Sequence, residues 1–135
     1  MKSNRKKIST QERLSVLWIV VMFTMGFADI LTFVLPEALN QMIKGTTDVR
    51  ITQELLLVMA VLVQIPILMI YLSRILQYKV NRCLNIIASI ITIIFVIGGG
   101  SLYLHYIFFA TIEVFVMLLI IWYSWKWRED ETEGV

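Results

Sequence analysis

Four long apolar segments, separated by short polar or glycine-rich stretches, dominate the chain. Each is close to the roughly 20 residues that a helix needs to cross about 30 Å of hydrocarbon. We therefore predict transmembrane helices over residues 10–35, 52–73, 81–98 and 102–125. Residues 37–44 have apolar positions at helical spacing and predict a short helix at the outer membrane interface. Together these elements predict an all-α fold, in which residues 1–135 form one domain, a four-transmembrane-helix bundle.

Several residues mark where the helices begin, end or bend. Ser9 and Glu12 have the spacing of a capping box just before the first apolar run, and Pro36 follows that run. Gly98–Gly100 marks the end of the third span. Pro66 lies inside the second span, where it removes one backbone hydrogen bond and predicts a kink.

Composition and charge fit this picture. Of the 135 residues, 59% are hydrophobic and 16% are charged, against roughly 25% charged residues in a soluble domain. Ten of the twelve lysines and arginines lie on one predicted side of the membrane, and only Lys44 and Arg50 lie on the other. Because positive residues stay inside, we expect both the amino and carboxyl ends to be cytoplasmic.

Small and polar residues indicate which helix faces point into the bundle, since lipid supplies no hydrophobic force between helices. The third span carries the clearest stripe: Asn81, Asn85, Ser89 and Thr92. The stripes predicted on the other spans are Gly26, Asp29 and Thr32 on the first, Gln53, Ala60, Gln64 and Tyr71 on the second, and Tyr106, Ala110 and Glu113 on the fourth.

Ionisable residues inside the spans are the strongest functional candidates, because a charge at the bilayer centre costs roughly 3 kcal/mol. At about 1.5 Å per residue from the predicted cytoplasmic ends, Glu113 lies about 16 Å deep, Asp29 about 22 Å and His105 about 28 Å. Gln64 and Thr92 lie about 12 to 14 Å deep on the same count. We therefore predict a polar layer that binds an ion or substrate, formed by Glu113, Asp29, Gln64 and Thr92 with Asn85 and His105.

A structural alternative stays open for the two acids. Neither Asp29 nor Glu113 has a basic residue at its own predicted depth, so each could be a neutral carboxylic acid that only donates a hydrogen bond. We expect Glu113 to point into the bundle, with Gln64 or Thr92 within hydrogen-bonding reach. If Glu113 faces lipid instead, a second subunit must cover it.

Other functional classes find little support in the sequence. The single cysteine, Cys83, excludes an internal disulfide and a cysteine-rich metal site. No phosphate loop, nucleophile triad or HExxH motif occurs, so we expect no enzyme, no catalytic residue, no metal and no cofactor. A haem or redox centre would have to use His105, beside Tyr103 and Tyr106, and a second chain would have to supply another ligand. The net charge of +2 is spread over separate segments, which argues against a nucleic-acid partner.

Several motifs in one order resemble a family of small bacterial four-helix membrane proteins known only as a domain of unknown function. The motifs are Ala28-Asp29-Ile30-Leu31-Thr32 with Pro36-Glu37, Ile51-Thr52-Gln53, Ile65-Pro66-Ile67, Ser73-Arg74, Asn81-Arg82 with Asn85-Ile86, Tyr106-Ile107-Phe108-Phe109 with Ile112-Glu113, and Trp122-Tyr123-Ser124-Trp125-Lys126-Trp127. The resemblance covers most of the chain. It implies four helices and a bacterial plasma membrane, and it implies no activity.

Two hypotheses for function follow. The first is a small transporter or channel-like protein, working as a homodimer in the lipid bilayer, whose polar layer binds a proton, a cation or a small cationic solute. The second is a non-catalytic adaptor that binds another membrane protein or anionic lipid. For lipid head groups the candidates are Arg74, Lys79 and Arg82, in a basic loop predicted between the second and third spans.

Overall fold

The computed structural model describes residues 8–46, 50–99 and 103–128, and this part of the chain is helical with short connections and no strand. Leu102, where the fourth span was predicted to begin, lies outside the described residues, as does the acidic segment 129–135. The helices are α1 Thr10–Val34, α2 Pro36–Lys44, α3 Gln53–Ile75, α4 Tyr78–Gly98 and α5 Leu104–Lys126.

Local sequence signals set several of the helix ends. The Ser9 hydroxyl accepts a hydrogen bond from the Glu12 amide at 3.2 Å, which caps the first turn of α1. The Thr52 hydroxyl caps α3 in the same way, accepting from the Leu55 amide at 3.1 Å. Gly45 ends α2 with a φ of 67°, a left-handed conformation that glycine adopts without steric cost.

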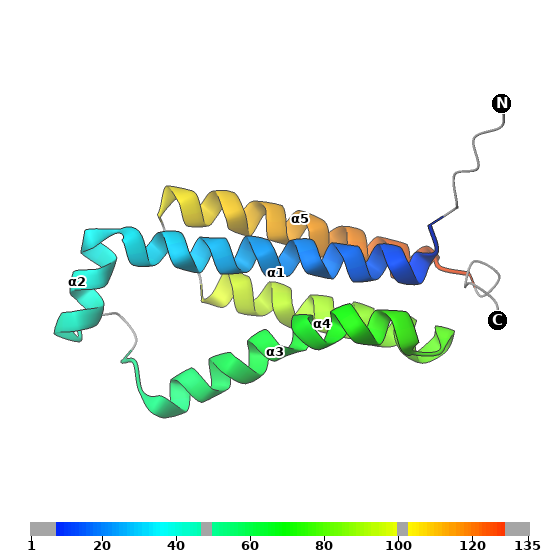
Figure 1. Ribbon diagram of the computed structural model, residues 1–135, viewed down its shortest axis with the longest axis horizontal. Helices are drawn as coiled ribbons and strands as arrows, with labels where there is room; N and C mark the ends of the chain where they lie inside the picture. Colours follow the sequence, from blue (N-terminus) through cyan, green and yellow to red (C-terminus); the bar gives the residue numbers. More distant parts are fainter. Residues whose placement is uncertain (1–7, 47–49, 100–102, 129–135) are drawn as a thin grey trace.

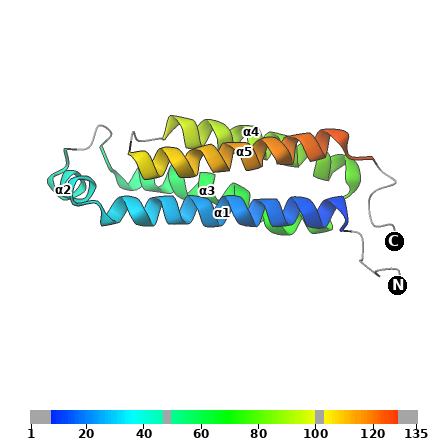
Figure 2. The ribbon, with the colours of Figure 1, turned by 90° about the horizontal axis from the view of Figure 1, so that it is seen from above.

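The four long helices run side by side as an antiparallel bundle, and α2 lies across one end (Figures 1 and 2). Both α1 and α4 pack against α3 and α5. The start of α1, the end of α5 and the α3–α4 turn meet at the opposite end, which we call the terminal end (Figure 1). Each long helix is long and apolar enough to cross a membrane. The protein is therefore an all-α, multi-pass membrane protein with four transmembrane helices.

The inward face of α1 differs in part from the predicted one. Its buried stripe is mainly apolar, with heptad-like spacing: Leu14, Trp18, Val21, Met25 and Ala28. Gly26, predicted to face protein, lines a shallow apolar surface with Phe23 and Phe27 instead. Close packing of large side chains, rather than small residues, therefore sets the orientation of α1.

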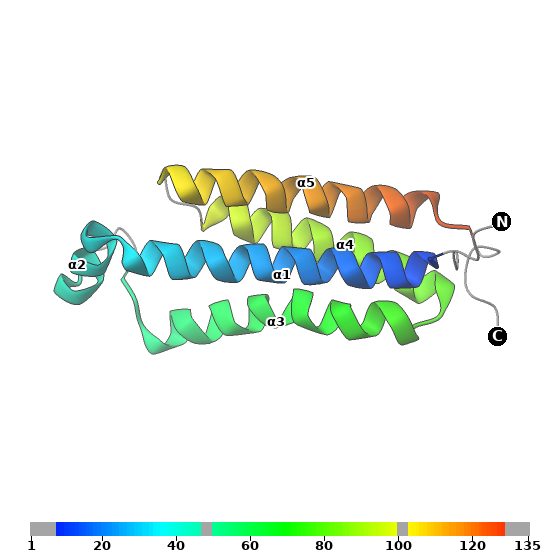
Figure 3. The ribbon, with the colours of Figure 1, turned by 45° about the horizontal axis from the view of Figure 1, so that its top comes forward.

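The predicted inward face of α3 is wrong. Gln53, Ala60, Gln64 and Tyr71 are all exposed, whereas α3 buries its opposite stripe, Pro66, Met69 and Ser73. The first half of α3 leans away from α4 and α5, and its second half lies against the bundle (Figures 1 and 3). The buried residues of α3 begin at Pro66, where a kink was expected. Burial of α3 therefore concentrates in its second half.

The α3–α4 connection is also shorter than predicted. Only Leu76 and Gln77 separate the two helices, because α3 continues to Ile75 and α4 begins at Tyr78. The three basic residues predicted to lie in a loop are consequently helical: Arg74 belongs to α3, and Lys79 and Arg82 belong to α4.

Candidate functional site

A cavity of about 190 Å³ lies in the half of the bundle next to α2, and all four long helices line it. We call it the acid cavity. Its lining residues are Met25, Ala28, Asp29, Thr32, Met59, Val63, Phe95, Val96, Gly99, Tyr106 and Glu113. Met59 and Val63 come from the first half of α3, so the cavity lies beside the part of that helix that leans outward.

The acid cavity brings together the two membrane acids. Glu113 is only 3% exposed, so the prediction that it points into the bundle is confirmed. Asp29 comes from α1 and is more exposed, but it lines the same cavity. No lysine, arginine or histidine is among the described lining residues. The cavity therefore concentrates carboxyl groups without a basic partner.

The rest of the wall is largely apolar and adds few hydrogen-bonding groups. The Tyr106 hydroxyl donates to the Val96 carbonyl at 3.4 Å, and the Thr32 hydroxyl donates to the Ala28 carbonyl at 2.8 Å. Thr32 Oγ1 also lies 3.0 Å from His105 Nε2, and the His105 ring stacks on Tyr103. His105 is thus held beside the cavity by side-chain contacts.

Three other residues of the predicted polar layer lie elsewhere. Gln64 is exposed on the outward face of α3. Thr92 is buried, but its hydroxyl donates to the Ala88 carbonyl of its own helix at 2.8 Å. Among the described residues, neither forms a hydrogen bond with Glu113, so that part of the prediction is wrong. Depth along a helix placed these residues at similar levels, but it does not determine their rotation about the helix axis.

Asn85 belongs to a separate buried network near the terminal end. We call this network the asparagine cluster; its members Trp18, Ser73, Asn81 and Asn85 are all 0% exposed. Asn85 Oδ1 accepts from Trp18 Nε1 at 2.8 Å and from Ser73 Oγ at 3.2 Å. Asn85 Nδ2 donates to the Asn81 carbonyl at 2.8 Å and to Asn81 Oδ1 at 2.6 Å. One amide thereby joins α1, α3 and α4.

One more bond completes the cluster, and another lies beside it. Asn81 Nδ2 donates to the Ser73 carbonyl at 2.7 Å. The buried Ser15 hydroxyl, which belongs to α1, donates to the Ile70 carbonyl of α3 at 2.8 Å. The predicted stripe of α4 is buried as expected. Sequence reasoning missed Ser15, Trp18 and Ser73, although a tryptophan well inside a span, away from the aromatic belts of the interfaces, was an available signal.

Two of the three predicted lipid-binding residues make contacts within the bundle. Arg74 Nε donates to Ser15 Oγ at 3.0 Å. Arg82 donates from Nε to the Ser124 carbonyl at 2.9 Å and from Nη2 to the Trp125 carbonyl at 2.8 Å, which caps the end of α5. Lys79 is exposed. Arg74 and Arg82 therefore have evident structural roles, whether or not they also contact lipid.

The family profile of DUF6326 matches residues 1–133, a range that includes all four transmembrane helices, the acid cavity and the asparagine cluster. No curated protein and no solved structure matches the chain. On the evidence of this nearly complete match, the chain belongs to DUF6326, a family of unknown function.

Proposed function

We propose that this protein moves a proton, a cation or a small cationic solute across a bacterial plasma membrane, with the acid cavity as its binding site. The observation that carries the proposal is the meeting of Asp29 and Glu113, from two helices, in one cavity whose described lining residues include no basic side chain. Acidic side chains inside a membrane bundle commonly mark ion pathways and proton relays.

Electrostatics favours a positively charged occupant. Two ionised carboxylates in one weakly polar cavity repel each other, because Coulomb interactions strengthen as the effective dielectric constant falls. A proton or a cation between them relieves that repulsion. The apolar wall formed by Met59, Val63 and Phe95 could also contact the carbon atoms of an organic cation.

The uneven packing of the bundle supports access from the α2 end. Toward the terminal end, the acid cavity is followed by buried core residues, including Val21, Met69 and Ile120, and by the asparagine cluster. We propose that α3 moves about Pro66 during transport, exposing the acids alternately to the two sides. With the positive residues placed inside, the terminal end would be cytoplasmic and the α2 end external.

We also propose that two copies associate through the outward face of α3. Gln64 exposes an amide there at membrane depth, and Gln53, Ala60 and Tyr71 are exposed on the same helix. An amide without a partner is costly in hydrocarbon. A second copy could supply that partner and cover the leaning half of α3.

Ion flux into liposomes tests the proposal. The wild-type protein is expected to dissipate a pH gradient or to carry a monovalent cation, while Glu113→Gln and Asp29→Asn lose most of that flux. Glu37→Gln is the matched control, because Glu37 is an exposed acid on α2. If the wild type gives no flux, or if both cavity variants conduct as the wild type does, the proposal fails.

A second candidate, the adaptor role, is favoured by the surface of α2. Leu39 and Ile43 on this short helix are 44% and 74% exposed. Among the described helices, α1 is the one against which α2 packs extensively. Such a helix could rest on the membrane or bind a neighbouring protein. Under this role, Leu39→Ser with Ile43→Ser would reduce co-purification of a specific membrane partner, and Glu113→Gln would not.

A further inference from the structure

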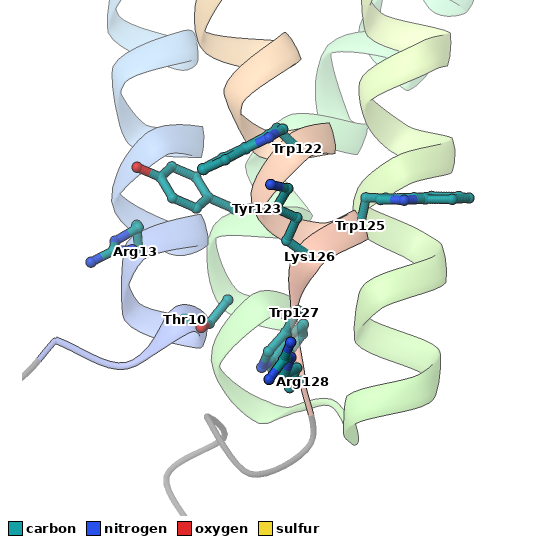
Figure 4. A pocket seen from close by; sticks show the side chains of 8 residues that line it. All are labelled: Thr10, Arg13, Trp122, Tyr123, Trp125, Lys126, Trp127 and Arg128. Atoms are coloured by element: carbon teal, nitrogen blue, oxygen red, sulfur yellow. The ribbon is translucent and has the colours of Figure 1, made fainter.

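Basic and aromatic residues surround a hollow of about 650 Å³ at the terminal end (Figure 4). It shares no described lining residue with the acid cavity. We call it the rim hollow. Thr10 and Arg13 line it from the start of α1, and the last turn of α5 with the residues that follow supplies Tyr123, Lys126, Trp127 and Arg128. Its volume lies within the range of small-molecule sites, roughly 300 to 1,000 Å³.

Three cations line the rim hollow, and none of its described lining residues is acidic. Aromatic rings hold two of the cations in place. The Arg13 guanidinium lies 4.8 Å from the centre of the Tyr123 ring, and the Lys126 ammonium lies 4.8 Å from the centre of the Trp122 ring. A cation held over a ring keeps N–H groups free to donate to an anion.

The helix ends near the hollow also suit an anion. The carboxyl end of α5 would ordinarily repel negative charge, but Arg82 occupies the carbonyls of Ser124 and Trp125. The Tyr78 hydroxyl donates to the Trp127 carbonyl at 2.6 Å. Thr10 stands in the first turn of α1, at the positive end of that helix dipole.

Trp127 provides a second observation that points to a ligand. Its side chain lines the hollow and is only 2% exposed, and its indole nitrogen has no acceptor among the described residues. A buried N–H donor without an acceptor is uncommon in folded proteins. Since this nitrogen is itself buried, an oxygen atom of an anion bound in the hollow would accept from it once a neighbouring side chain moves aside.

An exposed apolar strip on α5 ends at the hollow. Its residues are Phe115, Leu118, Trp122 and Trp125, spaced by three and four along the helix. A lipid whose phosphate lay in the hollow could lay its acyl chains along this strip. A free phosphate ion has no acyl chain and would make no apolar contact with this strip.

We propose that the rim hollow binds the phosphate of an acidic phospholipid, with Arg13, Lys126 and Arg128 as charge partners and the Trp127 indole as a donor. This site differs from the predicted lipid site at Arg74, Lys79 and Arg82. It does not depend on transport through the acid cavity.

Quenching of tryptophan fluorescence by brominated lipids tests the proposal, because Trp122, Trp125 and Trp127 line the hollow. The full-length protein is placed in phosphatidylcholine vesicles containing a small share of brominated phosphatidylglycerol. Brominated phosphatidylcholine serves as the reference lipid. The wild type is expected to prefer the acidic lipid. A triple variant carrying Arg13→Gln, Lys126→Gln and Arg128→Gln is expected to reduce that preference by about tenfold or more.

Lys44→Gln with Arg50→Gln is the control, since it removes two exposed cations outside the hollow and should leave the preference intact. Thermal melting checks that the triple variant remains folded. The proposal is overturned if the triple variant keeps the wild-type preference, or if the wild type shows none.

Two further arms of the experiment test for other occupants of the rim hollow. If inorganic phosphate, and not chloride at equal ionic strength, changes the tryptophan fluorescence while brominated phosphatidylglycerol gives no preferential quenching, the hollow takes free phosphate and the lipid assignment is wrong. If a preference appears only after Glu129→Gln, Asp130→Asn and Glu131→Gln, the chain's own acidic segment fills the hollow and the assignment is again wrong. An unchanged preference in both arms supports the lipid.

Discussion

The two halves of the transmembrane bundle place polar groups in opposite situations. Near the terminal end, Asn81 and Asn85 are buried with several hydrogen bonds each, and these bonds connect three helices. Near the α2 end, Asp29 and Glu113 line a cavity without a basic residue in its described wall. A polar group with its partners stabilises one packing arrangement, whereas an acid beside empty volume can accept a ligand. We therefore expect the first half to contribute stability, and the proposed function rests on the second half.

The largest expected effect on stability comes from removing the centre of the asparagine cluster. Asn85→Ala deletes bonds to Trp18, Ser73 and Asn81 and leaves two of their donors without an acceptor. We expect a loss of about 2–4 kcal/mol in the free energy of unfolding, because interhelical hydrogen bonds in membranes average about 0.6 kcal/mol and reach about 1.7. Titration with sodium dodecyl sulfate in mixed micelles measures this.

Thr111→Val is the control for that titration, because the exposed Thr111 hydroxyl bonds only to the Ile107 carbonyl of its own helix. It should change the free energy of unfolding by less than about 0.5 kcal/mol. Equal losses in the two variants would mean that the cluster has no special role in stability.

A smaller loss is expected for Trp18→Phe. Phenylalanine retains most of the buried ring area but lacks the indole N–H, so Asn85 Oδ1 keeps only the Ser73 hydroxyl as a donor. The free energy of unfolding should fall by about 1 kcal/mol. Trp125→Phe, at an exposed position, should lower the free energy of unfolding by clearly less. A larger loss for Trp125→Phe than for Trp18→Phe would contradict the role given to Trp18.

Assembly provides the next test, through the exposed amide of α3. If two copies meet on this face, Gln64→Leu removes a hydrogen bond between them and should raise the dimer dissociation constant by about threefold, the equivalent of a 0.6 kcal/mol bond. Dilution of fluorescently labelled protein in liposomes, followed by energy transfer, measures it. Leu57→Ala, also on an exposed part of α3, tests whether packing contributes. A wild-type protein that stays monomeric at every lipid dilution would contradict the proposed dimer.

The smallest effect is predicted for Ser89→Ala. The Ser89 hydroxyl is buried on α4 between Asn85 and Thr92 and has no hydrogen-bond partner among the described residues. Its removal should therefore leave the free energy of unfolding within about 0.5 kcal/mol of wild type, or raise it. A loss as large as that of Asn85→Ala would mean that burial alone, not bonding, determines the effect.

The sequence predicted the helices well for a physical reason. Apolar runs of membrane length have few alternatives in lipid, and the stripe on α4 stood out because its small and polar residues share one face. The face of α3 was predicted wrongly, because Ser73 and Pro66 make its contacts while the more polar Gln64 is exposed. Hydrophobicity and depth do not determine the rotation of a helix.

The candidate site, like the fold, was predicted only in part. Asp29 and Glu113 were recognised because acids are rare inside a membrane, and burial of Glu113 was predicted from its neighbours Ala110 and Tyr106. Among the described residues neither Gln64 nor Thr92 bonds to Glu113, because the sequence did not determine the rotation of their helices, and the hydrogen bond of Asn85 to Trp18 was missed. Such contacts depend on which helices are neighbours in the folded bundle. Trp18 of α1 and Asn85 of α4 are far apart in the sequence, so the sequence alone did not indicate their hydrogen bond.

The most direct test compares Glu113→Gln and Asn85→Ala in the same two assays, ion flux in liposomes and unfolding in mixed micelles. The comparison of the two halves predicts that Glu113→Gln loses most of the flux while its free energy of unfolding stays within about 1 kcal/mol of wild type. It predicts that Asn85→Ala loses about 2–4 kcal/mol of stability and keeps its flux per folded molecule. Equal loss of flux in both variants, or wild-type flux in Glu113→Gln, would contradict the account.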